Sequence, residues 1–205
     1  METGELLRAL RLEVWKQELA RRAALLTPAH VVRGVFIRGT LEVIREHGGE
    51  ELSNRCIEVC GLEQLVDLFS YPLQLEFQVL SAAISGLAAH CGSFERGLWL
   101  VGYRAGLEFG NTTGGKALLA LATGEPRKLL KSLPSAYRMS VSYGEHSLDW
   151  SGPTSAHWTM KGEFMPYPFH EGALTAMMEK TSAQALKVAG RQTDVLDSAY
   201  DISWE

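Results

Sequence analysis

The segment of this chain closest to a known chemical motif is Gly110-Asn-Thr-Thr-Gly-Gly-Lys-Ala117. Its glycine spacing and lysine match the loop that binds nucleotide phosphates through backbone N–H groups and an ammonium. Two features argue against that function. Ala117 replaces the hydroxyl residue that would bind magnesium, and the preceding residues have helical periodicity where a phosphate loop needs a strand. We therefore interpret the segment as a glycine-rich turn between two helices.

Three cysteines form the second group of reactive residue types. Cys56 and Cys60 are four residues apart, so on a helix their thiols would share one face. A structural zinc site needs two more ligands, and the adjacent pair His90-Cys91 projects in two directions. We therefore expect no metal and no cofactor, and we interpret the cysteines as small buried apolar residues, with the reactivity of each thiol left open.

Histidines and carboxylates offer few catalytic candidates. The sequence has six histidines but no His-x-x-x-His pair, and it lacks a Gly-x-Ser-x-Gly nucleophile motif. His170 and Glu171 precede the last predicted helix, where a side chain can face a cavity, so they are the candidates for acid–base chemistry. A pairing of Glu171 with Glu163 or Asp149 has no support from spacing. We expect binding rather than catalysis.

Aromatic residues indicate where a ligand would bind. Trp99 and Tyr103 lie on one predicted helix, and Trp158 and Tyr167 belong to the last third of the chain. Together with His170 they predict the wall of a pocket for an apolar small molecule or peptide, because aromatic side chains supply large apolar surfaces with polar edges. Packing of the same side chains in a core is the alternative interpretation.

The first two thirds of the chain are predicted to be mainly helical. Residues 5–26 have apolar residues near a helical spacing, which predicts an amphipathic helix: Leu6, Leu10, Val14 and Leu19. Its wet face would carry Arg8, Arg11, Glu18 and Arg22. This helix would cap the core or serve a dimer. The predicted helix 94–109 carries glycines that allow close approach of a neighbour: Gly97, Gly102 and Gly106.

The last third has the pattern of a small sheet with one helix. Alternating residues predict strands at 137–143 and 156–162, helical spacing follows at 172–180, and two further strands are expected at 185–188 and 199–204. We therefore predict a single α+β domain over residues 1–205. Its parts are the amino-terminal helix 1–27, a mainly helical half 28–134, and a sheet-plus-helix half 135–205 with strand-strand-helix-strand-strand order.

Composition limits the partners. Of 205 residues, 46% are hydrophobic and 21% charged, with a net charge of -4, which is typical of a globular protein and unfavourable for phosphate-backbone binding. We expect no nucleic-acid partner. No apolar run approaches the roughly 18 residues of a membrane helix, and the first residues lack signal-peptide features, so we expect no membrane insertion and a cytoplasmic location.

Several sequence blocks resemble those of a myxobacterial paralogous family of unknown function. The resemblance spans residues 30–204, in this order along the chain: Arg33-Gly-Val-Phe-Ile-Arg38, Tyr71-Pro-Leu73, Gly97-Leu-Trp-Leu-Val-Gly-Tyr-Arg104, Gly115-Lys-Ala-Leu-Leu119, Leu133-Pro-Ser-Ala-Tyr137, Glu171-Gly-Ala-Leu174 and Ala199-Tyr-Asp-Ile-Ser-Trp204. The carboxy-terminal pattern is in turn similar to four-vinyl-reductase-like domains, vesicle-tethering subunits and haem-based nitric-oxide sensors.

These resemblances imply a binding module whose two halves enclose an apolar cavity, and several such modules dimerise. The chain lacks the Tyr-x-Ser-x-Arg haem motif at Tyr137 and from Tyr143 onward, which argues against haem. We therefore expect a non-enzymatic sensory or binding homodimer with an apolar ligand. The alternatives are an enzyme or accessory protein of bacterial secondary-metabolite (modified peptide) biosynthesis, independent of cofactors, and an interaction scaffold without a cavity.

Overall fold

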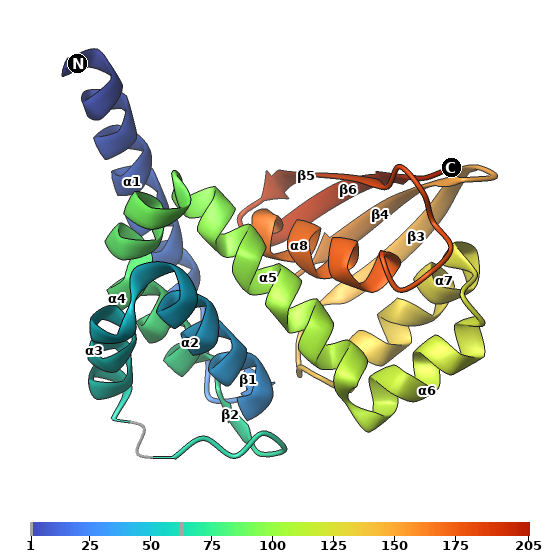
Figure 1. The fold of residues 1–205 in the computed structure, drawn as a ribbon, viewed down its shortest axis with the longest axis horizontal. Coiled ribbons are helices and arrows are strands. Elements are labelled where there is room, and N and C mark those ends of the chain that lie inside the picture. Colours follow the sequence, from blue (N-terminus) through green and yellow to red (C-terminus); the bar gives the residue numbers. More distant parts are fainter. Residues whose placement is uncertain (1, 62–63) are drawn as a thin grey trace. The chain divides into compact units, whose positions relative to one another are not determined.

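The computed structural model describes residues 2–61 and 64–205, and the chain forms two compact units, Met1–Leu98 and Trp99–Glu205. Helices dominate the first unit, and the second contains a four-stranded antiparallel sheet (Figure 1). The predicted α+β class is confirmed. Each unit has its own buried side chains, so each is described by itself.

The first unit is a set of helices closed by a short two-stranded ribbon. Its core is apolar, with Ile37, Ile44 and Leu80 completely buried where α2, α3 and α4 pack together. Its elements are α1 (Glu2–Ala23), β1 (Val31–Arg33), α2 (Gly34–Gly48), α3 (Glu50–Cys60), β2 (Ser70–Pro72), α4 (Leu73–Cys91) and the start of α5 (Phe94–Asn111). The ribbon is antiparallel.

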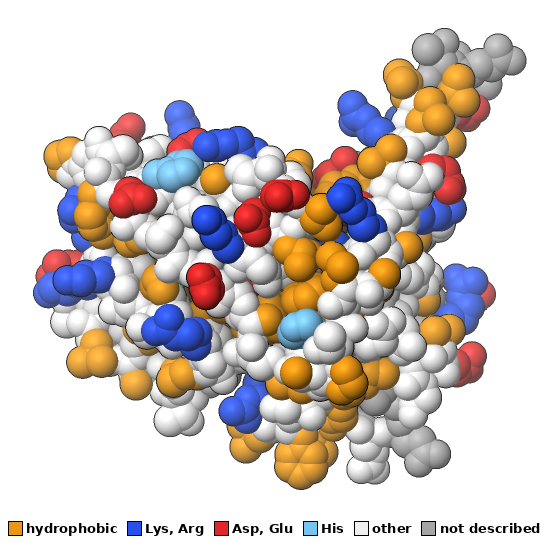
Figure 2. Space-filling view, turned by 180° about the vertical axis from the view of Figure 1, so that it is seen from behind, with side chains coloured by type: hydrophobic (Ala, Val, Ile, Leu, Met, Phe, Trp, Pro, Cys, Tyr) orange, Lys and Arg blue, Asp and Glu red, His pale blue; other side chains and the backbone are white. Residues whose placement is uncertain are grey.

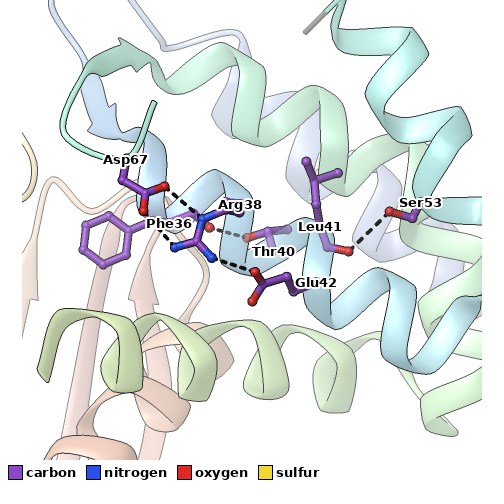
Figure 3. Close-up of polar contacts among 7 residues, drawn as sticks. All are labelled: Phe36, Arg38, Thr40, Leu41, Glu42, Ser53 and Asp67. Atoms are coloured by element: carbon purple, nitrogen blue, oxygen red, sulfur yellow. Dashed lines mark hydrogen bonds and ion pairs between the residues drawn. The ribbon is translucent and has the colours of Figure 1, made fainter. Parts of the chain in front are cut away.

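The segment before β2 caps the start of α2. The N–H groups of Gly34 and Val35 donate to the carbonyls of Phe69 and Asp67, which satisfies two of the free donors of the helix. The Arg38 guanidinium adds a two-point ion pair with the Asp67 carboxylate, at 2.9 and 3.0 Å (Figure 3). A methyl group at position 34 would overlap the backbone of this segment, so glycine is required there.

Helix α1 forms as predicted and buries Leu19 as expected, but most of its predicted apolar face is exposed. Leu19 is buried and Trp15 packs edge-on against Phe94, with ring centroids 5.7 Å apart. By contrast, the leucines and valine expected on the buried face are more than half exposed: Leu6, Leu10 and Val14. Hydrophobic side chains therefore show on the surface of this helix (Figure 2). Arg22, expected in water, is buried and paired with Glu18 at 2.7 Å.

The second unit places α8 on one face of the sheet. The strand order is β3-β4-β6-β5, and every neighbouring pair is antiparallel. Along β4, Ala156, Trp158 and Met160 are buried and the alternate residues are more exposed. The elements after α5 are α6 (Thr113–Ala122), α7 (Pro126–Tyr137), β3 (Glu145–Gly152), β4 (Ser155–Lys161), α8 (Tyr167–Met178), β5 (Lys187–Asp194) and β6 (Asp197–Ser203).

The glycine-rich segment after α5 is a turn between two helices, as expected. The Thr112 hydroxyl accepts a hydrogen bond from the Gly115 N–H and so caps the start of α6. A methyl group at position 115 would overlap the Phe109 carbonyl. A phosphate loop is therefore contradicted, because the element directly before this segment is helix α5 and not a strand.

The predicted strand-strand-helix-strand-strand order is confirmed, but its first strand is misplaced. Residues 137–143 are not a strand, since Tyr137 ends α7 and turns follow it. The strand begins at Glu145, after Gly144 with a φ of 85°. Helix α8 also begins five residues early, at Tyr167, because a proline suits the first turn of a helix.

Helices α5 and α8 touch backbone to backbone. Methyl groups at Gly102 and Gly172 would overlap the carbonyls of Phe169 and Trp99 respectively, and one at Gly106 would lie 2.6 Å from the Ala173 carbonyl oxygen. This confirms the close approach predicted for Gly102 and Gly106. No ligand can enter between the two helices where their backbones meet.

We predict that Gly102→Ala lowers the free energy of unfolding by about 3 kcal/mol, because the added methyl cannot be accommodated without moving α8. Urea unfolding measures the change. The matched control is Gly110→Ala on the same helix, whose methyl would lie 3.6 Å from Leu119; it should be neutral or stabilise by up to about 1 kcal/mol. Equal effects of the two substitutions would contradict the packing account.

Candidate functional site

The second unit encloses a buried carboxylate, Glu163, in the connection between β4 and α8. Its Oε1 accepts a hydrogen bond from His146 Nε2 at 2.7 Å, and its Oε2 accepts one from the Tyr137 hydroxyl at 2.7 Å. The ring nitrogen Nε2 of His170 lies 3.5 Å from the same Oε2. The Glu163 and two histidine side chains are each at most 3% exposed. We name these four residues the Glu163 cluster.

Four different segments bring the cluster together. Tyr137 ends α7, His146 points inward from β3, Glu163 follows β4, and His170 lies in the first turns of α8. The Glu163 N–H also donates to the Leu196 carbonyl at 2.7 Å, which fixes its backbone to the β5–β6 turn. A charge at this point therefore ties α7, α8 and the sheet to one another.

The electrostatics of the cluster favour an ionised Glu163. Burial raises the pKa of its carboxyl, but the hydrogen bond from His146 and the nearby His170 ring outweigh burial and lower the pKa to about 2. The pKa of Tyr137 is raised well above its ordinary value, first by burial and then by the Glu163 charge. Glu163 therefore stays ionised and Tyr137 stays protonated near neutral pH, so the hydrogen bond between them persists there.

Two polar atoms beside the cluster lack a hydrogen-bond partner. They are Nδ1 of His146 and Nε1 of Trp158, both buried, and their rings meet edge-on with centroids 5.6 Å apart. Buried polar atoms in native proteins normally have a partner, and an ordered water is the usual one where protein atoms supply none.

The two catalytic candidates have separate surroundings. His170 belongs to the Glu163 cluster, whereas Glu171 Oε1 accepts a hydrogen bond from the Gly190 N–H at 2.5 Å, and burial raises the Glu171 pKa. His157 lies on the other face of β4, with its Nδ1 2.7 Å from the Asp201 carboxylate. The sequence suggested Glu163 as a possible acid–base residue but did not point to His146. The alternation of β3, with its correct bounds, places His146 on the inward face.

The five residues predicted to line a ligand pocket lie in three different surroundings. Trp99 and Tyr103 stack on α5 with ring centroids 5.1 Å apart, and the Tyr103 hydroxyl donates to Glu179 at 2.6 Å. Trp158 and His170 are almost completely buried around the Glu163 cluster. Tyr167 begins α8 and is half-buried. Their role as a ligand wall stays a prediction.

The cysteines have carbonyl partners. The Cys56 thiol lies 3.8 Å from the Val79 carbonyl oxygen, and that of Cys60 lies 3.8 Å from the Leu75 carbonyl oxygen. Cys56 is completely buried and Cys91 half-buried. Burial raises the pKa of Cys56 to about 11, so its thiolate form is scarce. Within residues 2–61 and 64–205, no three His, Cys, Asp or Glu side chains are grouped to hold a metal ion.

In the described part of the chain, no single helix combines the length and apolarity to cross a membrane, and only the pair α4 and α5, bent by 105°, meets the criteria of length and composition together.

The backbone defines the class of fold: it is similar to that of H-NOX proteins. The Fe(II) unliganded H-NOX protein from K. algicida matches with a TM-score of 0.67 at 15% identity, over 84% of this chain and 96% of the other. An H-NOX from Shewanella woodyi, bound to IWP-051 in the Fe(II)CO state, matches over 84% and 94% at 18% identity and a TM-score of 0.60. An H-NOX protein from S. oneidensis in the Fe(II)NO state matches over 84% of this chain and 99% of its own, at 9% identity and a TM-score of 0.64.

The family follows from the sequence. Residues 25–205 match the family described as protein of unknown function (DUF2378), so this chain belongs to DUF2378. The expected membership in a family of unknown function and the expected likeness to nitric-oxide sensor folds are thereby confirmed. None of the curated proteins matches the chain. Helix α1 lies outside the matched residues.

We predict that Glu163 stabilises the protein in a pH-dependent way. Its folded-state pKa is below the ordinary 4.5, so the stabilisation is complete above about pH 4.5 and is lost as pH falls toward 2. Glu163→Gln should lower the free energy of unfolding by about 3 kcal/mol at pH 7 and by much less near pH 3.

Urea unfolding between pH 3 and pH 7 tests this, with Glu145→Gln, an exposed residue at the start of β3, as the control that should follow the wild type. A difference between wild type and Glu163→Gln that stays constant over this range would contradict an ionised buried Glu163.

Proposed function

We propose that this protein is a non-enzymatic sensory module that binds an apolar small molecule or peptide without haem. The observation that carries the proposal is the likeness of its backbone, over 84% of the chain, to H-NOX structures described in Fe(II), Fe(II)CO and Fe(II)NO states. Those descriptions are of ligand-binding proteins. A shared fold permits a different ligand, so the residues of this chain decide which one.

The histidines of this chain do not fit haem. A haem iron needs an axial donor that faces a pocket for the macrocycle. The two buried histidines, His146 and His170, direct Nε2 toward Glu163. Others lie at the surface, where His157 pairs with Asp201 and His90 with the Gly86 carbonyl. The backbone contact of α5 with α8 leaves no space for a planar group between these helices.

Binding of an apolar molecule suits the aromatic side chains that remain partly exposed. Trp99 and Tyr103 form a stacked pair on α5, and Tyr167 is half-buried at the start of α8. Such side chains supply apolar contact area and a polar edge, which is the usual lining of small-molecule sites. Glu163 is held ionised and Tyr137 is held protonated near neutral pH, so neither of these two groups is poised for proton transfer.

We predict that the purified protein binds the apolar fluorescent probe ANS saturably and that native mass spectrometry finds a retained small molecule. Trp99→Ala should weaken ANS binding about tenfold, because aromatic contacts contribute roughly 1 to 2 kcal/mol. Leu121→Ala removes an exposed apolar side chain on α6 and serves as the control. A clean apo mass, together with no saturable binding, would contradict the proposal. Turnover of a peptide intermediate that depends on His170 would favour the enzymatic alternative.

The proposal includes a homodimer formed through α1. Its exposed residues Leu7, Leu10 and Val14 follow the three- and four-residue spacing of paired helices, on the face away from Leu19. A pair of packed helices needs one such apolar stripe from each partner, and two copies of the chain supply both. This argument for a dimer applies to this chain and not to the whole family, because α1 lies before the residues that match the family.

We predict that Leu10→Glu abolishes the dimer, because it places a charge in the centre of the apolar stripe. Native mass spectrometry at micromolar concentration measures the oligomeric mass. Gln17→Glu, an exposed change on the same helix, adds the same charge near the end of the stripe and should weaken the dimer less. A wild-type protein that is monomeric would remove the dimer from the proposal and leave the binding module intact.

A further inference from the structure

The first unit contains a buried carboxyl group of a different kind, Glu76 on α4. The residue is 3% exposed, and its Oε1 lies 2.5 Å from the Thr40 hydroxyl on α2. Its second oxygen, Oε2, is buried and has no hydrogen-bond partner. Unlike Glu163, this carboxyl has no histidine or tyrosine among its hydrogen-bond partners, so nothing compensates a full negative charge.

The hydrogen bonds around Thr40 indicate where the proton lies. The Thr40 hydroxyl oxygen is 2.5 Å from Glu76 Oε1 and 3.2 Å from the Phe36 carbonyl oxygen, four residues earlier on α2 (Figure 3 shows the second contact). One hydroxyl has a single proton, so it serves two acceptors only as a weaker, shared three-centre bond. Both contacts are full two-centre hydrogen bonds if Glu76 is protonated, since its O–H then donates to Thr40 while Thr40 donates to Phe36.

The charged groups on the surrounding helices do not neutralise Glu76. On α2, the Arg38 guanidinium binds Asp67 and Glu42 (Figure 3), and on α1 the buried Arg22 binds Glu18. On α3, the Cys56 and Cys60 thiols face α4. Burial raises the pKa of both, and Glu76 raises that of Cys60 further. On β2, the Tyr71 hydroxyl accepts a hydrogen bond from the Val66 N–H.

We infer that Glu76 and Thr40 form a proton-controlled joint between α4 and α2 in the first unit. With the proton present, the chain from Glu76 through Thr40 to Phe36 is complete. When the proton leaves, the Thr40 hydroxyl turns to the carboxylate and releases Phe36, and a buried charge remains at the α2–α4 contact. The joint loosens, which gives the helical unit a pH response that is separate from the proposed ligand binding.

The expected pH range follows from the surroundings of Glu76. Burial raises its pKa to about 7, against a lowering by the hydrogen bond with Thr40. Because the folded-state pKa is above the ordinary 4.5, the stabilising effect of the proton is complete below about pH 4.5 and is lost as pH rises through 7. The sign is opposite to that of Glu163.

Hydrogen exchange of the α2 and α4 amides in the full-length protein tests the joint. Wild type and Glu76→Gln are compared at equal pH, so that intrinsic exchange cancels. The ratio of their opening constants should rise about tenfold per pH unit from pH 5 to pH 7 and level off above pH 8. Glu58→Gln, an exposed change on α3, is the matched control and should give a ratio near one throughout.

Infrared spectroscopy reads the proton itself. The carbonyl stretch of a protonated carboxyl should be present in wild type at pH 6, absent at pH 9, and absent at both in Glu76→Gln. Thr40→Val removes the donor that favours the charged form, so the wild-type midpoint should move upward, and this variant remains informative if Glu76→Gln fails to fold. Absence of the band at pH 6, or an exchange ratio constant from pH 5 to pH 9, overturns the inference.

Discussion

The buried negative charge of Glu163 is the constraint on which the second unit depends. A carboxylate removed from water requires several kcal/mol of compensation, and three side chains from three other segments direct hydrogens or ring nitrogens at it. The same charge explains a local detail of the chain. A methyl group at Gly144 would overlap the Glu163 carboxylate, and the positive φ at that position also favours glycine, so β3 begins just beyond it. Glu163 therefore fixes where α7 ends, β3 begins and α8 is held.

The order of elements could be predicted from the sequence, while their partners could not. Period-two and helical spacing were sufficient for strand-strand-helix-strand-strand, because each element buries one face in its own unit. Residues 137–143 have period-two alternation but form no strand, because α7 extends to Tyr137 and turns follow it. Because the strand was predicted too early in the sequence, the inward position of His146, which depends on the register of β3, was not predicted. Likewise, α1 has two apolar stripes, and spacing alone does not say which is buried.

The fold is similar to that of H-NOX proteins, but the buried polar side chains of this chain bind one another. Its interior histidines are fixed around a carboxylate, and glycines let α5 and α8 meet at their backbones. Both features use space and donors that a metal-containing macrocycle would require. The account of a sensory module without haem thus rests on the Glu163 cluster and the α5–α8 contact. The partly exposed aromatic side chains on α5 and α8 are the proposed contacts of an apolar ligand.

The most direct test of this account is a titration of the purified protein with haem, followed by visible absorption. If the interior histidines are held by Glu163, no saturable one-to-one complex with histidine-ligated iron forms, and His170→Ala leaves the spectra unchanged. A stoichiometric complex whose absorption band shifts in His170→Ala or His146→Ala would contradict the account, because it would show that these histidines are available to iron.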